Sequence, residues 1–137
     1  MTSTVSLHDA LIYVMVITSA ADSAMTDREL SSMGQVVRTL PVFNGFDENR
    51  IIAVAQECGE RLQAKNGMND VLDLIVASVP ERMRDTAYAV AVEIAAADLD
   101  VQQEELRLLQ ILRDRLGLDK LTVAAIERSA QARFRTT

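Results

Sequence analysis

Two stretches of the chain share one pattern: residues 20–30 read AADSAMTDREL, and residues 96–106 read AADLDVQQEEL. They align without gaps, and five of the eleven positions are identical. Each stretch follows an apolar segment and precedes a segment with apolar residues at steps of three and four, the spacing of one helix face. The pattern predicts two copies of a helical hairpin, each bending at an acidic turn.

The apolar stripe after each turn continues in the same register. With an offset of 76 residues, three pairs of apolar residues correspond: Met33 and Leu109, Val36 and Leu112, Leu40 and Leu116. A duplication also explains why the segments before the two turns resemble each other, since both are strongly apolar. We expect these two apolar helices to form the centre of the fold.

Helical periodicity runs through most of the chain, and no segment alternates convincingly at period two. Thr26 and Glu29 have the spacing of a capping box, while Asn66-Gly67 and Gly117 are typical of helix ends. These signals predict seven helices, at about residues 6–21, 27–40, 47–65, 69–79, 80–97, 102–116 and 120–134. We expect an all-α fold: one domain over residues 1–137, a compact bundle of about seven helices built from two hairpins related by a pseudo-twofold axis.

Composition excludes several classes of protein. Of the 137 residues, 49% are hydrophobic and 25% are charged, which are ordinary globular values. A single cysteine cannot form an intrachain disulfide, which predicts a reducing compartment such as the cytoplasm. A net charge of −6 and 4% aromatic residues argue against nucleic-acid binding. The longest apolar run, residues 11–17, is too short to span a membrane.

Charge is distributed unevenly along the chain. Residues 1–106 carry a net charge of −10, whereas residues 107–137 carry +4. One interpretation is a solvated helix face that offsets an acidic body. The other is a docking surface for an acidic partner or an anionic membrane.

The presence of an aspartate in each of the two turns, Asp22 and Asp98, needs a physical explanation. Both are expected at the end of a helix, where the macrodipole disfavours a carboxylate. In a structural interpretation, each aspartate accepts hydrogen bonds from backbone N–H groups of a tight turn, and Glu29 and Glu105 are capping residues.

A cation site is the functional interpretation of the same turns. Asp98, Asp100, Glu104 and Glu105 gather four carboxylates within eight residues, and hard cations such as Ca²⁺ prefer clustered oxygen ligands. The spacing is not that of an EF-hand, which needs a twelve-residue loop with glycine at its sixth position. Ala24 stands where the second copy has Asp100, so the second turn is the better candidate.

The paired AAD turns, the apolar first helix and the segment LRDRLGL at residues 112–118 resemble the tellurite-resistance protein TerB family. The resemblance covers about residues 7–134. It implies an all-helical, duplicated fold with an acidic metal-binding surface, in a bacterial tellurite, metal-ion or stress response. Ser23 and Leu99 stand where family members commonly have glycine, so either the turn differs or metal affinity is weaker. By position, the acidic residues of the family correspond to Asp22, Glu29, Glu93, Asp98, Asp100 and Glu105.

These observations favour binding over catalysis. The chain has one histidine, no glycine-rich phosphate loop, no G-x-S-x-G and no H-E-x-x-H. We therefore expect a non-enzymatic helical module whose acidic turns bind a divalent cation or face a protein partner. The alternative is a pure protein-interaction or scaffold domain, as in co-chaperones, whose acidic turns only cap helices. The resemblance also implies a peripheral association with a membrane complex, at the inner face of the membrane.

Overall fold

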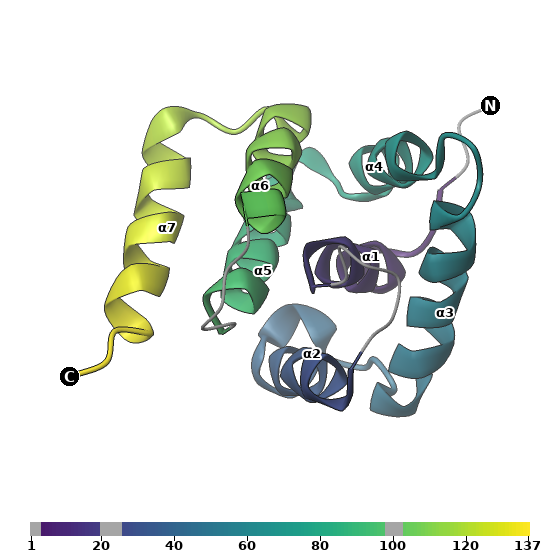
Figure 1. Ribbon diagram of the computed structural model, residues 1–137, viewed down its shortest axis with the longest axis horizontal. Helices are drawn as coiled ribbons and strands as arrows, with labels where there is room; N and C mark the ends of the chain where they lie inside the picture. The colour runs from purple at the N-terminus through teal and green to yellow at the C-terminus, as the bar shows by residue number, and fades with distance from the viewer. Residues whose placement is uncertain (1–3, 20–25, 98–102) are drawn as a thin grey trace.

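The computed structural model describes residues 4–19, 26–97 and 103–137, without the side chains of residues 103–105. The described residues form seven α-helices and three short 3₁₀ helices, with no strand among them, which confirms the predicted all-α class (Figure 1). The 3₁₀ helices are η1 (Pro41–Phe43), η2 (Glu48–Arg50) and η3 (Glu81–Met83). The α-helices are α1 (Leu7–Ser19), α2 (Asp27–Thr39), α3 (Ile51–Leu62), α4 (Gly67–Ser78), α5 (Arg84–Ala97), α6 (Gln103–Leu116) and α7 (Lys120–Arg133).

Helix α1 lies at the centre of the fold, with α2, α3, α4 and α5 packed around it (Figure 1). Nine of its thirteen residues, Ala10 to Thr18, are buried. A helix that is apolar on every side is stable in water only when other elements cover it completely. Helix α5 forms the most extensive contact with α1, as predicted for the two apolar helices. None of the described helices is long and apolar enough to cross a membrane.

Side-chain caps set the beginnings of several helices, and the one at the start of α2 is the capping box that the sequence predicts. At the start of α2, Glu29 N donates to Thr26 Oγ1 at 3.1 Å, and Thr26 N donates to Glu29 Oε1 at 3.1 Å. Together these bonds complete the capping box. The carboxylates of Asp47 and Asp119 accept from backbone N–H groups at the starts of η2 and α7. Helix α6 ends before Gly117, whose φ of 69° is the left-handed conformation expected after a helix.

The connection between α3 and α4 differs from the prediction. Gly67 was expected to end the third helix, but it is the first residue of α4, two residues earlier than expected. Its backbone does not have the positive φ of a helix-ending glycine, which the described chain shows only at Gly45 and Gly117. Instead, a Cβ at Gly67 would lie 2.3 Å from the carbonyl oxygen of Leu62. Glycine is required here because two backbone segments approach closely.

Helix α7 lies at the edge of the fold and packs mainly against α5 (Figure 1). The three-residue connection from Gly117 to Asp119 makes α6 and α7 antiparallel neighbours. In the stripe that follows each acidic turn, five of the six paired apolar residues are buried and Leu40 is half-buried. The duplication stays a prediction, because both of its turns lie outside the described residues.

Candidate functional site

The predicted cation-binding residues fall into two groups. Asp22, Asp98 and Asp100 lie outside the described residues, and Glu105 belongs to α6 with its side chain likewise outside them. Glu29 and Glu93 are described in full. Within the described side chains, no three His, Cys, Asp or Glu residues lie close enough together to hold a metal ion.

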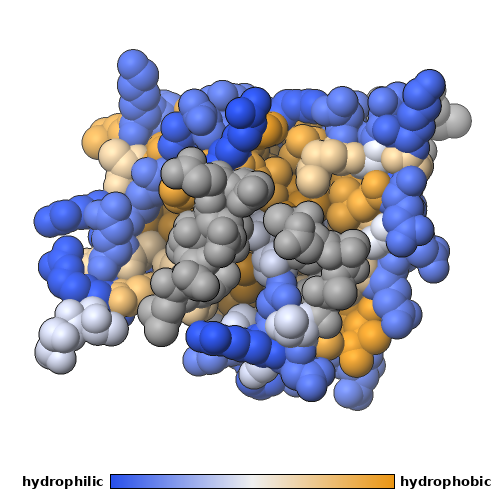
Figure 2. Space-filling model, in the orientation of Figure 1, coloured by the Kyte–Doolittle hydropathy of each residue, from blue (hydrophilic) through white to orange (hydrophobic). Residues whose placement is uncertain are grey.

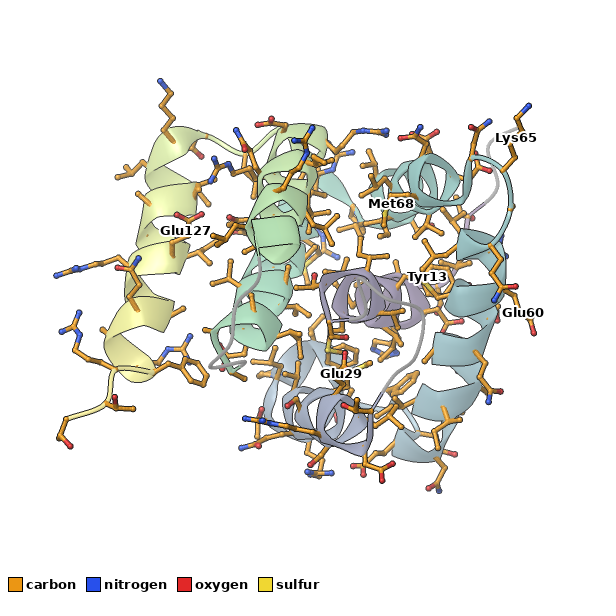
Figure 3. All side chains as sticks on the ribbon, viewed as in Figure 1. Tyr13, Glu29, Glu60, Lys65, Met68 and Glu127 are labelled. Carbon is orange, nitrogen blue, oxygen red and sulfur yellow. The ribbon has the colours of Figure 1, made fainter. Side chains whose placement is uncertain are left out.

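Glu29 has one carboxylate oxygen in use and one without a partner. Oε1 accepts from the backbone N–H of Thr26 at 3.1 Å and from its hydroxyl at 3.0 Å. Oε2 is buried and has no hydrogen-bond partner among the described residues. The side chain lies on the side of α2 that faces α1 (Figure 3). An unsatisfied buried carboxylate oxygen is costly and calls for a ligand or another physical reason.

Glu93 is held by an arginine of another helix. Its two oxygens accept from the two terminal nitrogens of Arg133 at 3.0 and 2.8 Å, a bidentate ion pair between α5 and α7. The ion pair raises the pKa of Arg133, because the adjacent carboxylate stabilises the charged guanidinium. A cation at Glu93 would have to compete with this pair.

A buried phenol of α1 makes a polar cluster that sequence reasoning missed. Tyr13 is fully buried, and its hydroxyl donates to Glu57 Oε1 at 2.5 Å and accepts from Arg61 Nε at 3.1 Å (Figure 3). Burial, with the bond to Glu57 as a second cause, raises the pKa of Tyr13 to about 12. Glu57 and Arg61 are four residues apart on α3, which was the only sequence signal for this cluster.

A second phenol cluster joins α5, α6 and α7. The hydroxyl of Tyr88 donates to Glu127 Oε2 at 2.5 Å, and Arg113 donates to the same oxygen at 3.2 Å. Burial, followed by the bond to Glu127, raises the pKa of Tyr88 well above its usual value. Glu127 points from α7 toward α6 (Figure 3). Tyr88 and Glu127 are 39 residues apart, so no local pattern could reveal the contact.

The cysteine and the histidine both have structural surroundings. Cys58 is fully buried, and burial raises the pKa of its thiol to about 12, which keeps it protonated and unreactive at neutral pH. His8 stacks on Phe43, and its Nε2 lies 2.8 Å from the carbonyl oxygen of Val42. Neither residue is part of a nucleophile–base pair in the described portion of the chain.

The fold defines an all-helical domain in which acidic stretches of sequence link α1 to α2 and α5 to α6. Two buried tyrosines, each bonded to a glutamate of another helix, link its helices. The chain belongs to the TerB family: the family described as "Tellurite resistance protein TerB" matches residues 8–128, most of its length. This match confirms the resemblance found in the sequence. Comparisons with curated proteins and with solved structures gave no match.

Proposed function

We propose that the chain is a non-enzymatic binding module of the TerB type, acting in a bacterial tellurite, metal-ion or stress response. Its acidic turns bind a divalent cation, Ca²⁺ or a similar hard ion. Family membership supports the class of module, and the sequence supports the cation through the carboxylates of the second turn. The single cysteine supports a cytoplasmic location, and the family resemblance supports peripheral association with a membrane complex.

The observation that carries the cation proposal is the free oxygen of Glu29. Thr26 occupies one side of this carboxylate, and Oε2 remains buried without a partner among the described residues. Glu29 lies four residues after Met25, the last residue of the first turn that the structure does not describe. A cation bound by Asp22 and Glu29 would satisfy Oε2 and offset the charge that the turn concentrates.

Calorimetry and thermal melting of the full chain with Ca²⁺, Mg²⁺, Mn²⁺ or Zn²⁺ test the proposal. We expect one of these ions at millimolar concentration to raise the melting temperature, since a ligand at about 100 times its Kd stabilises the fold by about 2.7 kcal/mol. Glu29→Gln and the double variant Asp98→Asn/Asp100→Asn should each reduce this shift. Glu81→Gln removes one exposed carboxylate at the opposite end of α5 and should leave it unchanged. Absence of any shift would refute the cation proposal.

A protein-interaction domain whose acidic residues only cap helices is the second candidate. The complete capping box at Thr26 and Glu29 favours it, because that box already gives Glu29 a structural role. In this case Asp98→Ala should cost about 1 kcal/mol of stability, as the loss of a cap does, with no response to cations.

A further inference from the structure

A groove of about 730 Å³ lies between α6 and α7, with α5 as its floor. Apolar side chains from all three helices line it: Val92, Ala96, Leu106, Leu109, Ala130 and Phe134. Leu106 is 54% exposed although it is a large apolar residue. In the view of Figure 2, apolar side chains reach the surface among hydrophilic ones. An apolar concavity with a polar rim is typical of a recognition site.

The lining residues repeat at helical spacing on both walls. On α6 the groove is lined at positions 106, 109, 110 and 113, and on α7 at positions 127, 130 and 131, followed by the capping residue Phe134. Each wall therefore presents one face over two turns, about 10 Å of helix. Since α6 and α7 are antiparallel, the groove runs along both axes. A groove of this form suits an amphipathic helix with apolar residues at steps of three and four.

The charge of the groove favours an acidic occupant. Arg113 is neutralised by its ion pair with Glu127, whereas Arg135 has no ion pair among the described residues. Arg107 and Arg128, both exposed, stand on the same two helices. The segment from residue 107 to residue 137 has a net charge of +4. Carboxylates of a partner along the rim would therefore be attracted to the groove, and basic side chains of a partner would be repelled.

The chain itself offers no matching helix in its described part. The apolar faces of α2, α3 and α4 are already buried in the core, and α1 and α5 are buried almost entirely. Helices α6 and α7 of a second copy carry exposed apolar residues, but their segment is positively charged and would bring like charge to the groove. A separate, acidic partner protein therefore fits the groove better than a second copy of the chain.

We propose that the groove between α6 and α7 docks an acidic amphipathic helix of a partner protein. Its apolar residues rest on Leu106 and Phe134, and a carboxylate pairs with Arg135. The proposal uses none of the predicted cation ligands and needs no cation, so it stands or falls independently of the cation site.

The probe is a designed, fluorescently labelled 15-residue peptide with leucines at steps of three and four and glutamates elsewhere. The control peptide has the same sequence with lysine in place of every glutamate. Anisotropy titrations of the full chain in EDTA should show binding of the acidic peptide, weakened by salt, and at least about tenfold weaker binding of the basic one. Failure of the acidic peptide to bind at millimolar protein, or equal binding of both peptides, would overturn the proposal.

Paired variants locate the binding. Leu106→Glu and Arg135→Glu change groove residues and should each weaken the acidic peptide at least about tenfold. Leu121→Glu, on α7, and Arg82→Glu, on η3, make the same changes at exposed positions outside the groove lining, and binding should stay within about twofold. Equal weakening by the control variants would place the peptide elsewhere. A dimer in light scattering that Leu106→Glu dissociates would make a second copy the occupant and overturn the proposal.

Discussion

Tyr13 and Tyr88 make matching contacts on opposite sides of the fold, since each phenol donates to a glutamate at 2.5 Å with an arginine beside it. The two tyrosines are not equivalent in the duplication, because the offset of 76 residues aligns Tyr13 with Ala89. Tyr13 takes both partners from α3, while Tyr88 takes Glu127 from α7 and Arg113 from α6. Each cluster ties one of the two central helices to the outer shell.

Removing either phenol hydroxyl should destabilise the fold. Tyr13→Phe and Tyr88→Phe should each lower the free energy of unfolding by about 1–2 kcal/mol, because a hydrogen bond to a charged acceptor is lost. Urea denaturation measures the loss. In a double-mutant cycle, Tyr88→Phe with Glu127→Gln should cost less than the sum of the single changes. Strict additivity would show that the 2.5 Å contact contributes nothing of its own.

Stability should fall at alkaline pH. Burial raises the pKa of Cys58 from 9.0 to about 12 and that of Tyr13 from 10.0 to about 12. A folded-state pKa above the unfolded value stabilises the protein fully below the unfolded pKa, and this contribution is lost as pH rises through the folded pKa. Urea midpoints should therefore decline from about pH 9 upward. Cys58→Ala should delay the onset to about pH 10, and an unchanged onset would contradict the assignment to this thiol.

Two glycines should respond oppositely to alanine. Gly67→Ala places a Cβ against the Leu62 carbonyl oxygen and should cost about 1–3 kcal/mol, because backbone must move. Gly59 lies inside α3 with open space around its Cβ position, so Gly59→Ala should gain about 0.5–1 kcal/mol. Thermal melting of both variants checks this. Equal changes in stability for the two variants would contradict a requirement for glycine at position 67.

Breaking the ion pair between Glu93 and Arg133 tests whether Glu93 has only a structural role or also binds a cation. Arg133→Ala should lower the free energy of unfolding by no more than about 1 kcal/mol, since the pair is partly exposed. If Glu93 also binds a cation, the same variant should tighten cation affinity in calorimetry. Unchanged affinity would remove Glu93 from the predicted ligand set.

Local signals predicted the helices, and tertiary contacts account for what was missed. The capping box at Thr26 and the left-handed Gly117 depend on neighbours in the chain, so sequence reveals them. The pair Asn66-Gly67 is typical of a helix end. Glycine is required at position 67, however, because the backbone of the preceding helix lies against it. Both tyrosine clusters and the partner of Glu93 join residues about 40 positions apart. No periodicity encodes such pairs, and the groove is formed by three helices at once.

Glu127 has two roles: its carboxylate accepts the hydrogen bond of Tyr88, and the same residue lines the groove. Any occupant that shifts this carboxylate changes the surroundings of a fluorophore in the interior. The chain contains two tyrosines and no tryptophan, so its tyrosine emission comes from Tyr13 and Tyr88 and is not masked by tryptophan. The protein thus carries a built-in optical reporter, and Tyr13→Phe would leave an emission signal that reads the groove from inside.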